Sequence, residues 1–579
     1  DDIYTSPSAS HVPMEPHVAV AHWDGGRLQV WTSTQSPHTV RATLARTFSC
    51  PPERIRVRTL NVGGAYGSKV VTGIEPVTAA AARMVGRPVR LELARDEVFL
   101  TVCKHAARVR IRTGVRNDGT LLARIVEVTW NAGAYATNSI DAAGYGMVRA
   151  PGPYHIPHVA VTSTAVRTNT VPSGPFRGAM TSQLCWAYES QLDDIASDLG
   201  IDPVEIRRRN LLRDGQRYAT GEVMRDLHYD EILDAVTTGL KRLPPAPAPL
   251  PGHARGTGVA LMIKSTQTPS RSECRIRLHA DGHAEVLTSS VEIGQGAHAT
   301  MRHLAAQALG LPDECVVVRQ PDTDVTPFDS LTASSRTTFA MGSAVQDAVR
   351  QLSETLLPVA AEALEVHPAD LRAVPGGFTT RDGARVGHGE LLRRKGLDSC
   401  EAWGRWESVG GLDSLDSNGQ GDASTHWHQG GVAVEVDVDL ETGRVQILRA
   451  HGACFAGRAV SPVRVRQQSE GGMIFGLGPA LFEELAYQDG QVVTVNMSDY
   501  LIPSIGDIPR QMGSTAVEST PKERAELHGV GEMTVPPVAP AIGNAIKAAC
   551  GVRLRHLPMT AERVLRALDD KAGKAGGVV

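Results

Sequence analysis

The chain has 579 residues, of which 42% are hydrophobic and 21% are charged, and its formal net charge is −4. This length exceeds what a single hydrophobic core supports, so more than one domain is expected. The chain has no long basic block, which argues against a nucleic-acid partner, and no apolar run reaches the length of a membrane span. We therefore expect no nucleic-acid binding and no membrane segment.

The cysteines are scattered, and no two of them are near enough to form a CxxC motif. They are Cys50, Cys103, Cys185, Cys274, Cys315, Cys400, Cys454 and Cys550. This spacing argues against a cysteine zinc site or an iron–sulfur cluster in this chain. It is typical of a reducing compartment, so a cytoplasmic location is expected. The chain begins at Asp1 without a signal-peptide pattern, which indicates a processed chain or a fragment.

The first 242 residues alternate between strand and helix patterns. Alternating apolar residues on both sides of Asp24-Gly25-Gly26 predict a β-hairpin over 17–32, and a second hairpin is predicted over 106–132. The other elements expected here are strands at 55–60 and 89–93, helices at 38–47 and 79–84, and helical residues over 186–212, in which Pro203 stands at a helix start. This mixture predicts an α+β fold, in which residues 1–242 form a first mixed α/β domain.

A proline-rich segment, 243–252, separates this part from the rest of the chain. Its prolines restrict the backbone, so we expect a semi-rigid linker. Residues 253–568 form a second predicted mixed α/β domain, with strands at 275–279, 284–291, 431–440 and 445–448 and a helix at 297–309. A polar surface loop is expected at 405–426, and residues 569–579 are predicted to be a disordered tail.

One carboxylate near the end of the chain stands in an unusual setting. Glu532 follows two close glycines, Gly529 and Gly531, and precedes three prolines and a predicted helix at 541–549. Glycines let a backbone approach a bulky ligand, and prolines stiffen a loop. This setting suits a positioned general base. The alternative is a capped helix entry with a surface glutamate, and these residues alone do not decide between the two.

Four turns share a pattern of small residues around one polar or aromatic side chain. They lie at 63–69, 176–178, 292–296 and 332–338. Each alone is most often an ordinary tight turn, and none has the sequence of a P-loop or of a Rossmann dinucleotide-binding turn. Together they can enclose an extended phosphorylated cofactor through backbone N–H groups and Arg or Gln side chains.

With these motifs in this order, the chain resembles the molybdenum-binding large subunit of the xanthine dehydrogenase / aldehyde oxidase family of molybdenum hydroxylases. The resemblance runs from about His11 to Leu568 and includes Ser33-Thr34-Gln35, the four turns, Asp499-Tyr500-Leu501-Ile502-Pro503 and the Gly-Val-Gly-Glu loop that ends at Glu532. It implies two large molybdopterin-binding domains. The N-terminal segment that precedes His11 in the family is missing from this chain.

The resemblance also implies a site, in which Glu532 matches the general base. The positions that match the surroundings of the cofactor are Gln35, Gly64, Tyr66, Gly67, Arg177, Gln295, Gly296, Ser334, Ser335, Arg336, Gln468 and Gly531. The positions that match the substrate side are Val70, Tyr145 and Ala179. The implied cofactor is molybdenum–molybdopterin, with the cytosine dinucleotide as the expected form. Its dithiolene sulfurs hold the metal, so no protein metal ligand is expected.

The implied reaction is hydroxylation of an aldehyde or N-heteroaromatic carbon, with water as the source of oxygen. In the family's mechanism the base takes the proton from a molybdenum-bound hydroxyl, whose oxygen attacks the carbon, while hydride passes to a sulfido ligand. The electrons then pass to a 2Fe-2S subunit and an FAD subunit, which we expect as partner chains. The missing N-terminal segment could be carried by a further chain.

Two departures from the family pattern bear on the substrate. Purine-specific members carry a glutamate where this chain has Val70 and an arginine where it has Tyr145, so the polar edge of a purine would be left unpaired. We therefore expect a wider pocket with an apolar wall and an aldehyde or neutral N-heterocycle as substrate, with xanthine or another purine as the alternative. Lys264 falls near another substrate-facing position, although a solvated surface lysine is favoured there. An alternative of another class is a cofactor-binding or scaffold homologue without catalysis, against which Glu532 and Arg177 argue.

Overall fold

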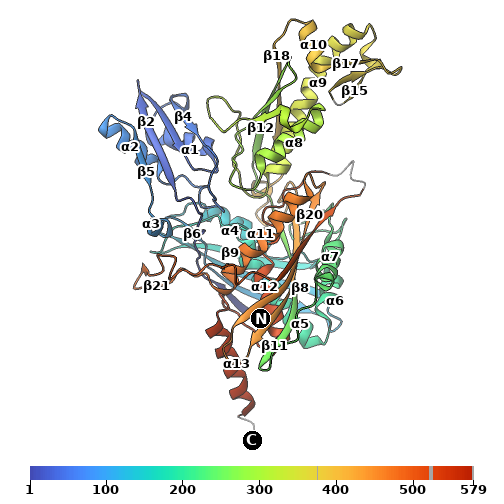
Figure 1. Cartoon of the computed structure of the whole chain (residues 1–579). Coiled ribbons are helices and arrows are strands. Elements are labelled where there is room, and N and C mark those ends of the chain that lie inside the picture. The colour runs from blue at the N-terminus through green and yellow to red at the C-terminus, as the bar shows by residue number, and fades with distance from the viewer. Residues whose placement is uncertain (375, 521–525, 577–579) are drawn as a thin grey trace.

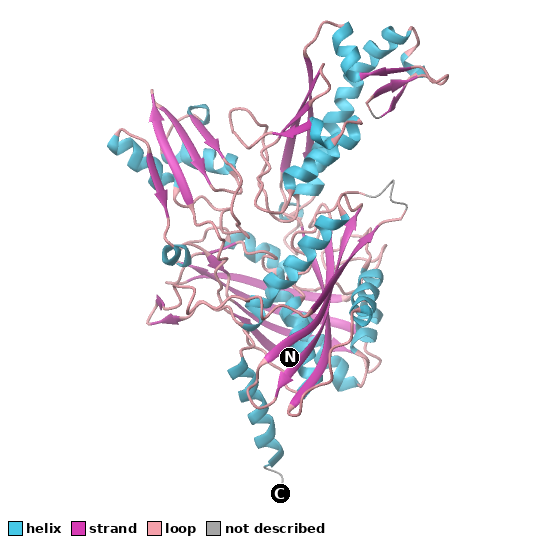
Figure 2. Cartoon of the chain, in the orientation of Figure 1, coloured by secondary structure: helices cyan, strands magenta, loops and turns pink. Residues whose placement is uncertain are grey.

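The computed structural model describes residues 1–374, 376–520 and 526–576. It consists of a base, built from both halves of the chain, and two lobes that stand on the same side of the base (Figures 1 and 2). The first lobe is formed by residues 18–92 and the second by residues 271–407. No helix in the described ranges is long and apolar enough to span a bilayer.

The base contains two four-stranded sheets. The first has the order β1-β7-β8-β9 and is made of β1 (Asp2–Ser6), β7 (Ala107–Val115), β8 (Leu121–Gly133) and β9 (His158–Arg167). The second has the order β11-β19-β20-β23 and is made of β11 (His253–Ser265), β19 (Trp427–Asp439), β20 (Val445–Gly457) and β23 (Gln511–Glu518). Strands β7 and β8 pair antiparallel, so the hairpin predicted over 106–132 is confirmed.

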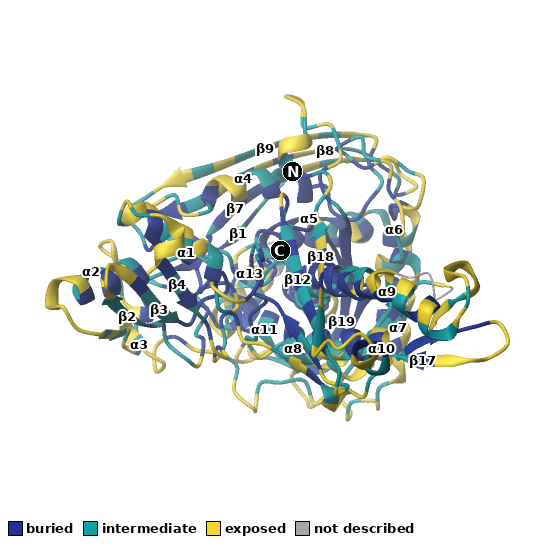
Figure 3. Ribbon diagram, turned by 90° about the horizontal axis from the view of Figure 1, so that it is seen from above, coloured by how far each residue is buried: buried dark blue, intermediate teal, exposed yellow. Residues whose placement is uncertain are grey.

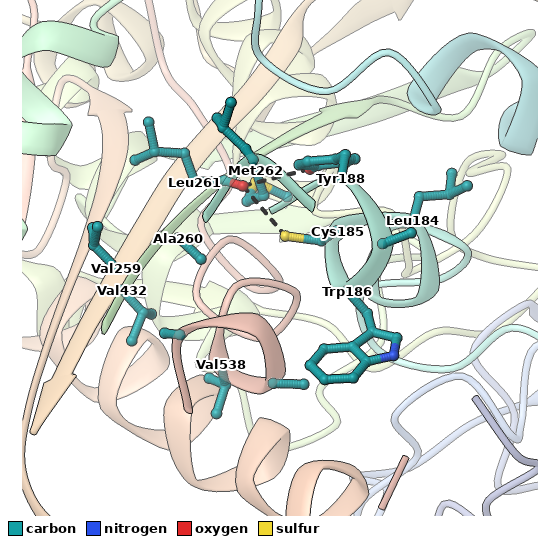
Figure 4. Packing of buried hydrophobic residues seen from close by; sticks show 14 of the residues in the cluster. Leu184, Cys185, Trp186, Tyr188, Val259, Ala260, Leu261, Met262, Val432 and Val538 are labelled. Atoms are coloured by element: carbon teal, nitrogen blue, oxygen red, sulfur yellow. Dashed lines mark hydrogen bonds between the residues drawn. The ribbon is translucent and has the colours of Figure 1, made fainter. Parts of the chain in front are cut away.

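Two buried helices connect the sheets. Helix α5 (Thr181–Leu199) contacts β1, β7 and β11, and helix α12 (Val538–Cys550) packs on α5, β11 and β19. From α5, the Cys185 thiol and the Tyr188 hydroxyl both donate to the carbonyl of Leu261 in β11, at 3.3 and 3.5 Å (Figure 4). One hydrophobic core therefore continues across the proposed boundary at 243–252, where residues 244–250 form no regular structure. The bounds proposed for the two domains stay a prediction.

The first lobe is a four-stranded sheet with two helices. Its strands have the order β4-β3-β2-β5 and are β2 (Val18–Asp24), β3 (Arg27–Thr32), β4 (Ile55–Arg58) and β5 (Val89–Glu92). The helices are α1 (Pro37–Thr47) and α2 (Glu75–Val85). The predicted hairpin over 17–32 is confirmed, because β2 and β3 pair antiparallel on both sides of the Gly25-Gly26 turn.

The second lobe repeats this plan on a larger scale. Its strands have the order β14-β13-β12-β18 and are β12 (Arg271–His279), β13 (Ala284–Leu287), β14 (Val316–Val318) and β18 (Ser399–Glu407). Helices α8 (Ala297–Leu309) and α9 (Gly342–Leu364) pack on it, and a π-helix, η3 (Thr337–Met341), precedes α9. An outer part contains β15 (Arg372–Val374), β16 (Gly377–Thr379), β17 (Arg385–Gly387) and α10 (His388–Arg394).

Short elements complete the chain. The strands are β6 (Cys103–Lys104), β10 (Ser173–Gly174), β21 (Tyr487–Gln488) and β22 (Gln491–Val492). The helices are α3 (Arg95–Phe99), α4 (Ser139–Arg149), α6 (Pro203–Asn210), α7 (Tyr229–Arg242), α11 (Pro462–Leu481) and α13 (Ala561–Gly576), and the 3-10 turns are η1 (Pro52–Arg54), η2 (Asp313–Cys315), η4 (Pro368–Asp370) and η5 (Leu412–Ser414). Buried residues concentrate inside the base, whereas β9, at the edge of its sheet, has alternate residues exposed (Figure 3).

The ends of the helices bear on two sequence predictions. The helical residues predicted over 186–212 form two helices, α5 and α6, and the helix start predicted at Pro203 is confirmed. Gly200 ends the first helix in a left-handed conformation, and Asp202 caps the second. The disordered tail predicted over 569–579 is wrong for residues 569–576, which belong to α13, and residues 577–579 lie outside the described residues.

Candidate active site

A cavity of about 820 Å³ lies where the base and both lobes meet. It brings together turns that are far apart in the sequence. The sequence-predicted site residues that line it are Gln35, Gly64, Tyr66, Gly67, Val70, Tyr145, Arg177, Ala179, Gln295, Ser334, Ser335, Gln468, Gly531 and Glu532. A second hollow of about 880 Å³, between β1 and α13 in the base, contains none of them.

Glu532 is fixed at the cavity wall by three donors. Its Oε1 accepts from the backbone N–H of Gly178 at 3.0 Å, and its Oε2 lies 3.1 Å from the Ser335 hydroxyl and 3.0 Å from Lys264 Nζ. Burial by itself would raise the pKa of this carboxyl, but the Lys264 ammonium and the hydrogen bonds outweigh burial, and the pKa is lowered. The side chain is 13% exposed, so the alternative of a surface glutamate is wrong.

Two glycines make this arrangement sterically possible. Gly178 has φ +81°, and a Cβ on it would lie 3.0 Å from Ser182 Oγ and 3.2 Å from Pro536 Cγ. A Cβ on Gly529 would lie 1.6 Å from the carbonyl oxygen of Ser335, so only glycine lets these two turns touch. The glycines of this loop were expected to let its backbone approach a ligand. At Gly529 the close approach is to the Ser335 turn.

Lys264 differs most from its sequence-based interpretation. It lies in β11, is 1% exposed and pairs with Glu532, so the solvated lysine favoured from sequence is wrong. Its Nζ also donates to Ser334 Oγ at 3.1 Å. Burial lowers the pKa of Lys264 to about 8, against the opposing effect of Glu532. Lys264 and Glu532 therefore form a charged pair at neutral pH.

Arg177 ties two loops of the cavity together. Its Nε donates to the Gly531 carbonyl at 2.6 Å and its Nη2 to the Gln468 carbonyl at 3.1 Å. The guanidinium lies 5.8 Å from the ring centroid of Phe475, which stacks on Tyr66 with 4.9 Å between centroids. Phe475 was not predicted. Phe475 follows Gln468 by seven residues in α11, so the two side chains lie on the same face of the helix. This spacing is the sequence signal from which Phe475 was predictable.

Gln35 leaves one polar atom of the cavity without a partner. Its Nε2 donates to the Thr332 carbonyl at 2.8 Å, while its buried Oε1 has no hydrogen-bond partner among the described residues. Buried polar atoms are normally paired, so a bound polar group would complete this one. Positive φ angles recur in the neighbouring turns, and such turns can gather N–H groups into an anion-binding concavity: Gly64, Tyr66, Gly67, Ser334 and Ser335.

Two predicted cofactor residues make hydrogen bonds within the fold. Arg336 is fully buried, with donors 2.7 Å from Asp329 Oδ1 and 2.6 Å from Ser272 Oγ. Gly296 is the N-cap residue of α8, and its N–H donates to Glu292 Oε1 at 2.9 Å. Neither lines the cavity, so the prediction that they contact the cofactor finds no support in the geometry.

The substrate side is more polar than predicted. The Tyr145 hydroxyl is engaged by the backbone of Thr268, which it contacts at 3.1 and 3.2 Å. One turn further along α4, Arg149 also lines the cavity, with its guanidinium centre 4.6 Å from the Tyr145 ring centroid. Arg149 was missed, although its i+4 spacing from Tyr145 could have indicated it. Val70, Tyr145 and Ala179 line the cavity as expected, and Arg149 and Lys264 add two cations that the expected apolar wall did not include.

Three histidines lie close together behind Lys264. The ring centroid of His426 is 4.5 Å from that of His428 and 5.1 Å from that of His528. Burial holds the pKa of His426 and His428 well below the usual value, so both are neutral near pH 7. In the described ranges, no three or more His, Cys, Asp or Glu side chains are placed to hold a metal ion.

Known proteins match this chain along nearly its whole length. Two models of a molybdopterin cofactor-binding domain match residues 1–211 and 240–509. The chain is 33% identical over 578 residues to the xanthine dehydrogenase molybdenum-binding subunit of Escherichia coli O157:H7, which covers 97% of this chain and 76% of that protein. The chain belongs to this family of molybdenum-binding subunits.

Other molybdenum-binding subunits and related enzymes agree with this assignment. The aldehyde oxidoreductase molybdenum-binding subunit PaoC of Escherichia coli K12 is 30% identical over 591 residues, covering 98% of this chain and 76% of that protein. Among solved structures, quinoline 2-oxidoreductase from Pseudomonas putida 86 superposes with a TM-score of 0.87 at 25% identity, covering 98% of this chain and 76% of that chain. The family resemblance, the mixed α/β fold with two molybdopterin-binding domains and the class of molybdopterin-dependent oxidoreductase are confirmed.

Proposed function

We propose that this subunit binds molybdopterin, in its cytosine dinucleotide form, in the cavity around Glu532. It then hydroxylates an aldehyde or an N-heteroaromatic carbon, with water as the source of oxygen. One observation carries the proposal. Glu532 is an ionised carboxylate held by Gly178, Ser335 and Lys264 beside the turns that suit a large polar cofactor.

The side chains of the cavity fit this cofactor. The buried Oε1 of Gln35 has no hydrogen-bond partner among the described residues, so a polar group of the cofactor would complete it. At the opposite loop, Arg177 donates a hydrogen bond to the Gln468 carbonyl. A volume of about 820 Å³ suits an organic cofactor together with a small substrate. Gln35, Arg177 and Ser334 would surround the metal end of the cofactor, and Gln295 and Gln468 would hold the pterin or its tail. When bound, the cofactor supplies the metal that activates water and accepts two electrons from the substrate carbon.

The residues around Glu532 prepare it to accept a proton. Gly178 and Ser335 fix the direction of the carboxylate, and Lys264 keeps it ionised. Because the ammonium of Lys264 also weakens the base, Glu532 becomes a stronger base when Lys264 loses its proton, and the pKa of Lys264 is about 8. Glu532 is therefore poised for general-base catalysis near neutral and mildly alkaline pH.

A purine is the second candidate substrate. The relatives include xanthine dehydrogenase subunits, and the cavity holds the cations Arg149 and Lys264 in addition to Val70 and Tyr145. Arg149 provides a donor for a purine oxygen, so the polar edge of a bound purine would not be left entirely unpaired. This weakens the argument against a purine substrate. The alternative of an inactive scaffold is disfavoured, because a scaffold has no need of a buried, ionised carboxylate.

We also propose partner chains and a location. Relatives such as the xanthine dehydrogenase and aldehyde oxidoreductase proteins are subunits, which supports a multi-subunit enzyme. A 2Fe-2S subunit and an FAD subunit would then take the electrons. The scattered, unpaired cysteines support a cytoplasmic location.

A screen on the assembled enzyme tests the proposal. Molybdenum and pterin would be quantified per chain, and dye reduction would be followed with aldehydes, simple azines and xanthine. We expect close to one molybdenum per chain and turnover of at least one aldehyde or azine. Full cofactor without any turnover would favour the scaffold alternative. A kcat/KM for xanthine above that of every aldehyde and azine would favour the purine alternative.

A further inference from the structure

Arg149 is a buried cation whose hydrogen-bond partners are all neutral. It is 2% exposed and donates through Nε to Ser265 Oγ at 2.9 Å, through Nη1 to the Ala179 carbonyl at 2.8 Å and through Nη2 to the Ser265 carbonyl at 2.9 Å. Within the described part of the chain, no carboxylate forms an ion pair with it. A guanidinium carries five N–H donors, so two remain for a ligand in the cavity that Arg149 lines.

The carboxylates that could compensate this charge are engaged or distant. Glu532 contacts Lys264, Gly178 and Ser335, and it forms no ion pair with Arg149. Asp141 lies on the same helix, but it is exposed and eight residues earlier, which is about 12 Å along the helix axis. Burial lowers the pKa of Arg149 only to about 10, so the group stays charged at neutral pH. A buried charge without a partner is unfavourable, and a bound anion would relieve it.

The fold explains part of this charge but not all of it. Arg149 is the last residue of α4, where the helix dipole favours a cation, and it lies over the ring of Tyr145. Neither effect uses the two remaining N–H donors. The adjacent Lys264 precedes Ser265 in β11 and adds a second positive charge to the same wall, although Glu532 balances that one.

We propose that the substrate carries a carboxylate, which Arg149 binds through its two remaining donors while the carbon to be hydroxylated faces Glu532. This inference rests on the proposed function and narrows it to carboxylated aromatic aldehydes or carboxylated N-heterocycles. A planar guanidinium with two free donors suits bidentate pairing with a carboxylate. The neutral substrate expected from the apolar wall is replaced by an anionic one.

The test uses pairs of substrates that differ only in charge. The assembled enzyme is assayed with 4-carboxybenzaldehyde and 4-carbamoylbenzaldehyde, and with the corresponding 3-isomers. For at least one isomer, we expect kcat/KM for the carboxylate to exceed that for the amide about 10-fold or more. Arg149→Gln is expected to bring this ratio to about 1, and Arg149→Lys to restore part of it. Arg350→Gln, which removes one exposed charge from α9, is the matched control and should leave the ratio unchanged.

Binding separates this proposal from the proposed function. Benzoate and benzamide are titrated against the wild-type enzyme and Arg149→Gln by calorimetry, which requires no turnover. Tighter binding of benzoate that is lost in Arg149→Gln supports the anion site, even if no aldehyde is oxidised and the proposed function fails. Equal or weaker use of the carboxylate by an active wild-type enzyme, for both isomers, overturns the inference. If Arg149→Gln does not fold, the wild-type ratio decides alone.

Discussion

Replacing Glu532 by glutamine tests the assigned base directly. Glutamine has nearly the same shape and keeps an oxygen for the Gly178 N–H, which now lies 3.0 Å from Oε1, but it cannot accept a proton at neutral pH. A general base contributes about 10²- to 10⁴-fold to the rate, so kcat is expected to fall by that factor. At about 1.4 kcal/mol per tenfold, the loss is about 3–5 kcal/mol of transition-state stabilisation. Cofactor content is expected to stay near the wild-type level.

The substitution also leaves Lys264 without its partner. Removing one member of a buried ion pair costs about 3–5 kcal/mol of stability, because the other charge stays buried. Part of this cost is relieved, since the pKa of Lys264 is about 8 and falls further once the carboxylate is gone. The double variant Glu532→Gln/Lys264→Met removes both groups, so we expect it to recover thermal stability but not activity.

Dye-reduction kinetics, molybdenum content and thermal unfolding of the single and double variants form the assay. We expect both variants to be inactive, but only the single variant to be clearly less stable than the wild type. If Glu532→Gln, fully loaded with cofactor, kept more than about a tenth of the wild-type kcat, Glu532 would not be the base. Equal stability of the two variants would show that Lys264 and Glu532 are not coupled as the 3.0 Å contact implies.

Three further predictions concern Gly178, the metal content of the isolated chain and Lys264. Gly178→Ala should lower kcat about 10- to 100-fold, because a Cβ at φ +81° crowds Pro536 and moves the N–H that holds Glu532. Steady-state kinetics measure this effect. Gly471→Ala is the control, because no atom lies near the position of its added Cβ. The purified, partner-free chain should contain molybdenum and pterin but no iron and no flavin, and stoichiometric iron by metal analysis would contradict the cysteine-spacing argument. KM for 4-carboxybenzaldehyde should increase as the pH rises above about 8, where Lys264 loses its proton, while KM for the amide stays constant. Through this range Glu532 remains ionised, Arg149 remains charged, and His426 and His428 remain neutral. Parallel pH profiles of KM for the two substrates would refute the reasoning.

Local signals made parts of the fold predictable. The hairpin over 17–32 could be recognised because its apolar alternation and its Asp-Gly-Gly turn lie within one short segment. Pro203 carried a similar local signal for the start of α6, whereas the end of α5 at Gly200 was not predicted, because the helical pattern continues across it. The shared core of the base was not predictable in this way, because α5 and α12 meet β11 only through contacts between distant parts of the chain.

Family motifs gave the positions of the site residues but not the directions of their side chains. Glu532 and Arg177 line the cavity as the motifs implied. Arg336 belongs to the same turn as Ser334, yet its guanidinium turns inward to Asp329. Which of two neighbouring side chains faces a ligand depends on backbone angles such as φ +58° at Ser334, and these angles follow from tertiary contacts that a motif does not contain.

The charges of the substrate wall show where sequence patterns stop being informative. Alternation in a strand separates an inner from an outer face only when one face is exposed, but every residue of β11 from Val259 to Ser265 is buried. Lys264 therefore could not be assigned to the cavity from its strand, and a lysine is rarely buried without a partner. Its partner, Glu532, comes much later in the chain, on a loop that the second sheet and the Ser335 turn position. Burial of Lys264 and ionisation of Glu532 thus depend on each other, and both depend on the completed fold rather than on either segment.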